Sequence, residues 1–113
     1  MIKVYIASPY TLGEDTAANV KLQIDTVDTL IGLGFCPFAP LMSHFQHMIH
    51  PRPYNDWMEQ DFEWVKACDC LLRIGGDSPG GDKEAALAKS LGKPVLYSLT
   101  DLVKKYKRLE TVE

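Results

Sequence analysis

Short apolar segments alternate with helical ones along the whole chain, and this alternation restricts the possible folds more than any other feature. Four segments are rich in β-branched and other apolar residues, while the segments between them carry apolar residues at helical spacing. The expected strands are 2–7, 35–39, 70–74 and 94–98, and the expected helices are 15–33, 56–67, 82–91 and a last one from about residue 100.

Strands separated by helices predict a parallel sheet with helices on both faces. Right-handed crossovers and short connections favour the strand order 2-1-3-4. We therefore expect a three-layer α/β fold, Rossmann-like or flavodoxin-like, with four or five strands. A length of 113 residues with 46% hydrophobic residues predicts one domain over 1–113.

The charge balance restricts the partners. A formal net charge of -3 and the lack of a dense Lys and Arg run argue against nucleic acid and membrane surfaces, and favour a small-molecule ligand. The start of the chain has no long apolar stretch, so we expect a cytoplasmic protein. Its three cysteines are predicted to be buried free thiols.

No metal or other cofactor is expected. His44, His47 and His50 are spaced three apart, so on a helix they would drift around its surface rather than converge on one ion.

The expected topology places a ligand site at the carboxyl ends of the first and third strands, where the chain reverses direction across the sheet. The loops there are 7–13 and 75–82. The second is glycine-rich and opens into a helix, whose free N–H groups and dipole suit a phosphate. Alternatively, Ser78, Asp82 and Glu84 only cap that helix.

Asp61 is expected near the start of the preceding helix, at the same end of the sheet as Glu84. Two carboxyl groups facing one pocket suit cleavage of a glycosidic bond, where one attacks the anomeric carbon and the other handles the proton of the leaving group.

Three segments, YIASPY at 5–10, EQDFEWVKACD at 59–69 and SPGGDKE at 78–84, together resemble the nucleoside 2-deoxyribosyltransferase family. Within it, the likeness is greatest to the 2'-deoxynucleoside 5'-phosphate N-glycosidases. The resemblance implies that Glu84 is the nucleophile, kept ionised by the first turn of its helix, and that Asp61 assists proton transfer to the departing base. Ser78 stands where phosphate-processing members carry serine and free-nucleoside transferases carry aspartate, which implies a 5'-phosphate.

The resemblance also implies site residues on the first loop. Tyr5, grouped with the catalytic residues, lies with Ala7 and Ser8 on the family's first loop at the sugar side, and Tyr10 is expected to contact the substrate. The N–H groups from Gly80 to Asp82 are expected to bind phosphate. The proline-containing middle loop, taken as residues 43–57, is interpreted from its residue types alone. Its ring-bearing side chains are expected either to form a lid that stacks on the base or only to pack against the sheet edge; they are Phe45 and Trp57, with His47 and Tyr54. Gly81 completes the predicted phosphate loop.

These inferences predict a hydrolase or transferase that acts on the N-glycosidic bond of a 2'-deoxynucleoside 5'-monophosphate. The chain is expected to form a homodimer or larger assembly, because so short a chain leaves apolar helix faces uncovered. Two alternatives remain open: a non-catalytic sensor of nucleotides or nucleotide sugars, and an N-glycosidase that acts on a nicotinamide dinucleotide.

Overall fold

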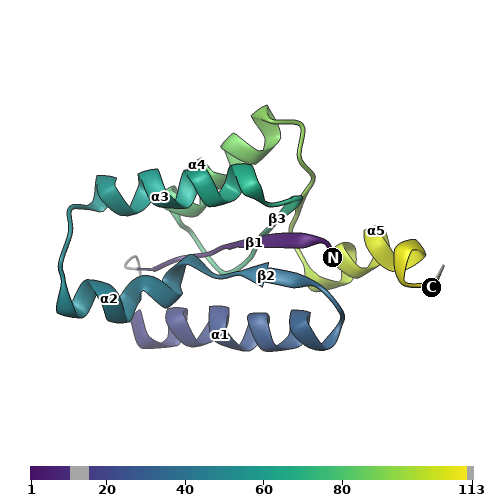
Figure 1. Cartoon of the computed structure of the whole chain (residues 1–113), viewed down its shortest axis with the longest axis horizontal. Helices are drawn as coiled ribbons and strands as arrows, with labels where there is room; N and C mark the ends of the chain where they lie inside the picture. Colours follow the sequence, from purple (N-terminus) through teal and green to yellow (C-terminus); the bar gives the residue numbers. More distant parts are fainter. Residues whose placement is uncertain (11–15, 112–113) are drawn as a thin grey trace.

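The computed structural model describes residues 1–10 and 16–111, and within them four strands form one parallel sheet in the order β2-β1-β3-β4 (Figure 1). This confirms the predicted strand order. None of the described helices is long and apolar enough to cross a membrane. The elements in chain order are β1 (Lys3–Ala7), α1 (Thr16–Gly32), β2 (Cys36–Phe38), the 3-10 helix η1 (Pro40–Ser43), α2 (His44–Ile49), α3 (Tyr54–Ala67), β3 (Cys70–Arg73), α4 (Pro79–Ser90), β4 (Val95–Leu96) and α5 (Leu99–Thr111).

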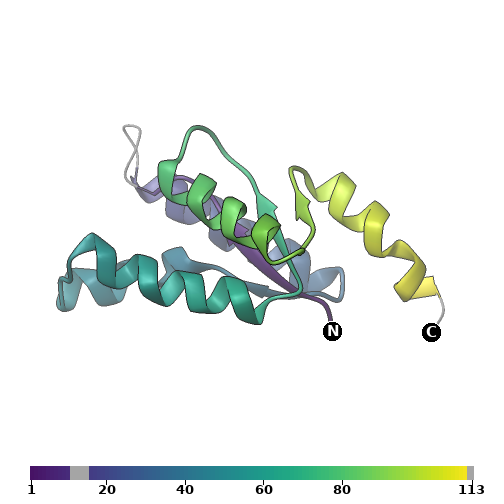
Figure 2. The same cartoon turned by 90° about the horizontal axis from the view of Figure 1, so that it is seen from above.

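Helices cover both faces of the sheet, as predicted. In Figure 1, α3 and α4 lie above the sheet and α1 lies below it, and Figure 2 shows α3 and α4 side by side from above. Because successive side chains of a strand point to opposite faces, β1 serves two cores. Val4 and Ile6 pack with Leu30 of α1 and Leu102 of α5, on the lower face.

The opposite face of β1 carries Tyr5 and Ala7, which pack with Val65 of α3 and with Ala85 and Ala88 of α4. The two alanines are small enough to let α4 approach the sheet closely. The strand period therefore aims the Tyr5 side chain at the helix that carries the predicted nucleophile.

Several predicted boundaries are wrong. Helix α4 begins at Pro79 rather than at residue 82, because Ser78 is its N-cap and proline fits the first helical position. Helix α3 begins at Tyr54, with Pro53 as N-cap, rather than at residue 56. The stretch after β2, expected to be irregular, contains η1 and α2. The predicted helix start at 15 and the loop residues 11–13 lie outside the described residues.

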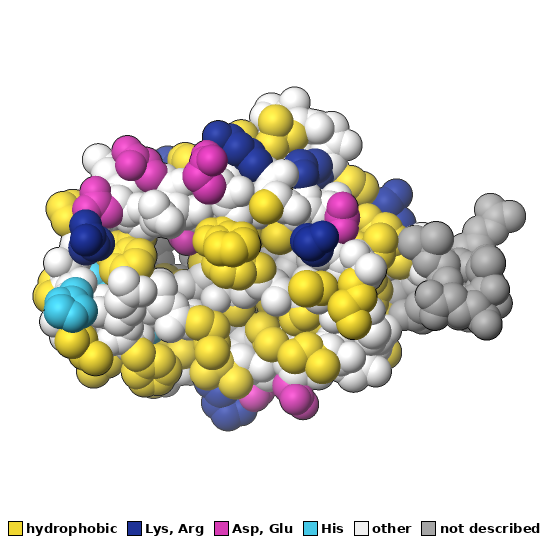
Figure 3. All heavy atoms as spheres, viewed as in Figure 1, with side chains coloured by type: hydrophobic (Ala, Val, Ile, Leu, Met, Phe, Trp, Pro, Cys, Tyr) yellow, Lys and Arg dark blue, Asp and Glu magenta, His cyan; other side chains and the backbone are white. Residues whose placement is uncertain are grey.

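The buried face of α1 also differs from the expected one. Of the apolar residues at helical spacing in α1, Val20 and Leu30 are buried as expected, whereas Ile24 and Ile31 are 40% and 60% exposed. The polar Gln23 and Thr26 are buried instead. Figure 3 shows apolar side chains gathered along the lower edge of the view, over α1 and α2. The predicted homodimer stays a prediction. Exposed apolar residues of this region include Leu22, Met42, Phe45, Met48 and Ile49.

The three cysteines are free. Cys68 and Cys70 are buried, as predicted, and burial raises the pKa of the Cys68 thiol to about 11. The prediction is wrong for Cys36, which is exposed because it lies on the edge strand β2.

Candidate active site

A pocket of about 650 Å³ lies at the carboxyl ends of β1 and β3, where the topology predicts a ligand site. Its walls come from the segment after β1, from η1 and α2, and from the N-terminal parts of α3 and α4. Of the residues proposed from the sequence, those that line it are Ser8, Tyr10, Trp57, Asp61, Ser78, Gly80, Gly81 and Glu84.

The other proposed residues lie elsewhere. Ala7 is fully buried in the core, so its side chain does not face the pocket. Asp82 is exposed and pairs with Arg73 on another side of α4. Phe45 is 58% exposed and packs edge-on against His44 rather than lining the pocket. Tyr5 reaches the site from below, through Glu84.

Glu84 and Tyr5 meet at the buried end of the pocket. Tyr5 is 0% exposed and Glu84 only 4%, and the Tyr5 hydroxyl donates a hydrogen bond to Glu84 Oε2. Burial, and then the charge of Glu84, raise the pKa of Tyr5 well above its usual value. Tyr5 therefore stays protonated and acts as a fixed donor to one carboxyl oxygen of Glu84.

Asp61 of α3 lies close enough to Glu84 for each carboxyl group to shift the pKa of the other. Burial raises the pKa of Asp61 to about 6. For Glu84, burial is again the largest cause, the Tyr5 hydrogen bond opposes it, and the charge of Asp61 adds to it, which raises the pKa to about 8. Between these values the two carboxyl groups share one proton and one negative charge.

The expectation that the start of α4 keeps Glu84 ionised is therefore wrong. Because α4 starts at Pro79, Glu84 is its sixth residue and lies in the second turn, beyond the free N–H groups. Loss of solvation in the buried site outweighs the helix dipole there.

Ser78 joins the glycine-rich segment to α4. Its side chain is buried, and its Oγ accepts a hydrogen bond from the Gly81 N–H at 2.9 Å. The Asp82 N–H bonds to the Ser78 carbonyl oxygen, also at 2.9 Å. Two of the N–H groups expected to bind phosphate are thus used within the chain. The Ser78 hydroxyl accepts one bond as a helix cap and can still donate its own hydrogen to a ligand.

Two cationic side chains line the pocket within the described part of the chain, and sequence reasoning missed both. Lys83 Nζ lies 5.8 Å from the ring centroid of Tyr54, and Arg52 pairs with Asp56 at 3.3 Å. The position of Lys83 directly before Glu84 is the only sequence signal for it. Their charges favour an anionic ligand at the mouth of the pocket.

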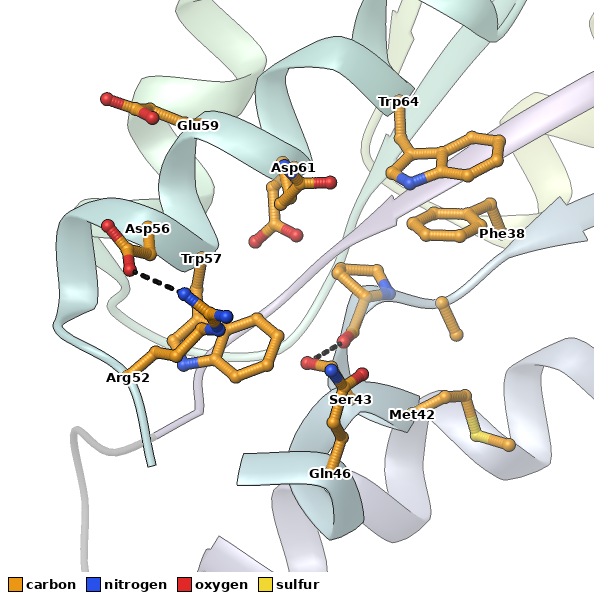
Figure 4. A pocket seen from close by; sticks show the side chains of 13 residues that line it. Phe38, Met42, Ser43, Gln46, Arg52, Asp56, Trp57, Glu59, Asp61 and Trp64 are labelled. Carbon is orange, nitrogen blue, oxygen red and sulfur yellow. Dashed lines mark hydrogen bonds and ion pairs between the residues drawn. The ribbon is translucent and has the colours of Figure 1, made fainter. Parts of the chain in front are cut away.

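A second cavity of about 750 Å³ lies on the other side of Asp61, between α3 and the η1–α2 segment. Figure 4 shows the Asp61 carboxylate projecting from α3 into the space between Trp57 and Trp64. Trp64 stacks on Phe38, with ring centroids 4.5 Å apart and planes 18° from parallel. Trp57, Asp61 and Arg52 line both cavities, so the site has two lobes that meet at Asp61.

Hydrogen bonds connect the middle segment to both sides of the site. His47 Nδ1 accepts from Trp57 Nε1 at 2.8 Å and from the Arg52 N–H at 3.3 Å. The Tyr10 hydroxyl and His44 Nδ1 form a hydrogen bond of 2.5 Å. His47, Tyr54 and Trp57, all expected near the ligand, line the pocket, and the bonds to His47 hold it beside Trp57. Among the residues that the structure describes, no cluster of His, Cys, Asp and Glu could hold a metal ion.

Comparisons with known proteins agree with this architecture. The family described as "Domain of unknown function (DUF7768)" matches residues 2–98. No curated protein matches the chain. A solved structure of a 2-deoxyribosyltransferase from Bacillus psychrosaccharolyticus is 26% identical, with a TM-score of 0.59, over 82% of this chain and 69% of that one. A 2-desoxiribosyltransferase from Leishmania mexicana is 20% identical, with a TM-score of 0.65, over 95% and 72%; at that identity the likeness shows the fold alone.

Proposed function

The chain belongs to the DUF7768 family, and from the chemistry of its site we propose that it cleaves the N-glycosidic bond of a 2'-deoxynucleoside 5'-monophosphate. The observation that carries the proposal is the pair formed by the half-buried Asp61 and the buried Glu84, with the Tyr5 hydroxyl on Glu84, at the junction of two lobes. The distant structural resemblance to a 2-deoxyribosyltransferase supports the same bond type.

The first step is an attack by Glu84 on the anomeric carbon. The single proton of the pair must then lie on Asp61, and transfer between the two interacting carboxyl groups achieves this without a proton from solvent. The Glu84–carbon bond forms, the carbon–nitrogen bond breaks, and Asp61 delivers its proton to the departing base. The Tyr5 hydroxyl stabilises the Glu84 carboxylate before the attack.

The second step releases the sugar. Asp61, now ionised, accepts a proton from water as that water attacks the glycosyl ester on Glu84. Attack by another base instead of water would give transfer. Glu84 leaves as a carboxylate, so the one-proton state of the pair is restored in either case.

The two lobes suit the two ends of a nucleotide. Ser78 and Lys83 line the lobe that contains Glu84, and they offer a hydroxyl donor and a cation to a 5'-phosphate. The other lobe has the stacked rings of Phe38 and Trp64 at one end and suits a planar base. Asp61, at the junction, lies where the bond between sugar and base would be.

The proposal is tested by incubating the purified protein with a panel of deoxynucleoside monophosphates, free deoxynucleosides, ribonucleotides and a nicotinamide dinucleotide. Released base is measured by chromatography, with and without a second base as acceptor. Release from a deoxynucleoside monophosphate supports the proposal. Release of base from the dinucleotide alone would show that a nicotinamide dinucleotide is the substrate instead. Binding without release of base across the panel would favour a nucleotide sensor.

Ser78→Ala is expected to reduce kcat/KM for the monophosphate by roughly 10- to 100-fold, because one hydrogen bond to a charged group, about 1.5–3 kcal/mol, is lost. The free nucleoside is the internal control and should change little. Ser78→Asp should reduce use of the monophosphate further, because it places a negative charge beside the phosphate. Since Ser78 also caps α4, thermal unfolding is measured alongside. Equal losses on both substrates would remove phosphate recognition from this residue.

The rate should follow a bell-shaped pH profile. Below about pH 6 both carboxyl groups are protonated and no nucleophile remains; above about pH 8 both are ionised and no acid remains. The measurement is kcat/KM from pH 4.5 to 9.5. Asp61→Asn removes the shared proton and should abolish the alkaline limb. A rate that rises without limit toward high pH would show that Asp61 does not act as an acid.

A further inference from the structure

Arg73 is the last residue of β3, on the face that α4 covers. Leu71, two residues earlier on the same face, packs with Ala85 and Ala88 of α4. Arg73 pairs in register with Ala7 of β1, and it is only 9% exposed. A cation buried this deeply destabilises a fold unless its N–H groups form hydrogen bonds.

The Arg73 guanidinium bonds to three places in the chain. Nη1 donates to the Ile74 carbonyl oxygen at 2.6 Å, and Nη2 donates to the Gly76 carbonyl oxygen at 2.8 Å. Nε donates to Asp82 Oδ1 at 3.1 Å. The rigid fork of one side chain therefore fastens the end of β3, the glycine-rich loop and the first part of α4 to one another.

The surroundings leave these segments little room to shift. A Cβ at Gly81 would lie 3.1 Å from Arg73 Nε and 3.0 Å from Ser78 Oγ, so the start of α4 lies directly against the guanidinium. A Cβ at Gly75, whose φ is +80°, would lie 2.6 Å from Pro9 Cδ. A side chain is therefore excluded at Gly75, and one at Gly81 would require its neighbours to move by a few tenths of an ångström.

We propose that Arg73 is a positioning residue for the reaction: by fastening the loop and α4 to the end of β3, it fixes where Glu84 lies relative to Tyr5 and Asp61. This role rests on the proposed function. Glu84 lies two residues after Asp82 on α4, so a shift at the Arg73–Asp82 contact also changes where Glu84 lies relative to the Tyr5 hydroxyl.

The charge of Arg73 acts in the same direction. It lowers the pKa of Glu84, against the larger effect of burial. The titratable and charged groups that face Glu84 are thus the Tyr5 hydroxyl from β1, Asp61 and Tyr54 from α3 and the Arg73 charge from β3. Of these, Tyr5 and Arg73 favour the carboxylate that a nucleophile requires.

The test compares Arg73→Gln, Arg73→Lys and Asp82→Asn with the wild type. Lys21→Gln is the matched control, because Lys21 is an exposed cation paired with Asp25 far from the site. Three quantities are measured on each protein: thermal unfolding, kcat and KM on the best substrate of the panel, and the titration of the Glu84 carboxyl group by ¹³C NMR without ligand. The Glu84 signal is assigned from its absence in Glu84→Gln.

Arg73→Gln should reduce kcat by about 100-fold with KM nearly unchanged, as expected when reacting groups are misplaced. It should also raise the pKa of Glu84. Arg73→Lys should restore that pKa in part but not kcat, because an ammonium cannot reproduce the fork. Asp82→Asn, which keeps the fold because Asp82 is exposed, should reduce kcat about tenfold at most, through the one bond it weakens.

Loss of thermal stability with unchanged kcat and unchanged Glu84 titration in Arg73→Gln would overturn the proposal. If Arg73→Gln does not fold, Asp82→Asn decides by the same two readouts. If the wild type turns over no member of the panel, the proposed function fails, and the titration alone decides: a Glu84 pKa that rises in Arg73→Gln and not in Lys21→Gln supports a role of Arg73 at Glu84, and an unchanged one overturns it.

Discussion

Glu84→Gln is expected to lower turnover by at least about 10³-fold while leaving nucleotide affinity nearly unchanged. An amide cannot form the glycosyl ester, but it has nearly the shape of the protonated acid that burial favours at this position. Glutamine should therefore fit the pocket and still accept the hydrogen bond from Tyr5. The measurements are single-turnover base release and equilibrium binding of the same nucleotide.

Glu63→Gln is the matched control for that experiment. Glu63 lies on α3 with 70% of its side chain exposed, paired with Lys66, so its loss should change neither rate nor affinity. Base release by Glu84→Gln at a rate close to that of the wild type would rule out a covalent intermediate on Glu84. If the wild type and Glu84→Gln bind the nucleotide equally well and the wild type releases no base, the protein is instead a sensor.

The same substitution should stabilise the protein in alkaline solution. The pKa values of Asp61 and Glu84 are raised to about 6 and about 8 in the folded state, above the roughly 4 of an unfolded chain. The folded protein therefore binds more protons than the unfolded one between these limits, and its stability falls as the pH rises through 6 and 8. Glu84→Gln has no ionisable group at this position, so it loses less folding stability than the wild type as the pH rises.

At pH 9 the unfolding free energy of Glu84→Gln, relative to that of the wild type, is expected to be higher by on the order of a few kcal/mol. The difference should shrink toward zero near pH 4. It is measured as the unfolding free energy in denaturant at four or five pH values. Asp25→Asn, at an exposed carboxylate, is the control and should follow the wild type. Parallel curves for wild type and Glu84→Gln would show that Glu84 is not buried as an ionisable pair with Asp61.

The order of the sheet could be predicted because alternating strands and helices leave few right-handed arrangements. The set of buried residues on α1 could not be predicted in full. Gln23 is buried because its amide nitrogen donates to the Ile6 carbonyl oxygen and to Ser8 Oγ, and its oxygen accepts from the Leu41 N–H. A polar residue with partners from β1 and η1 looks like a solvent-facing one in a single sequence. The apolar spacing therefore identified Val20 and Leu30 correctly, but it also pointed to the exposed Ile24 and Ile31 and missed the buried Gln23 and Thr26.

The start of α4 was missed for a local reason. Gly80 and Gly81 have low helix propensity and suggest a loop, yet the Ser78-Pro79 pair is a strong helix start. The three-residue error also misplaced Glu84 within its helix and led to the wrong ionisation state. The burial that raises its pKa comes from tertiary packing against β1 and α3, which no local pattern records.

The candidate site was predicted unevenly for the same reason. The sheet topology alone brings the ends of β1 and β3 together, so Ser8, Ser78 and Glu84 share a pocket. The three bonds of Arg73 and the contact between Lys83 and Tyr54 depend on distances across the fold. Spacing along the chain carries no information about either.

The cap at the start of α4 gives this scaffold an evolutionary freedom. Serine and aspartate are both among the best N-cap residues, so position 78 can exchange one for the other while α4 keeps its first hydrogen bond. The exchange alters only the charge presented to the pocket. Under the proposed function, a lineage could therefore change between ligands with and without a phosphate through stable, folded intermediates, and selection would meet no folding barrier at position 78.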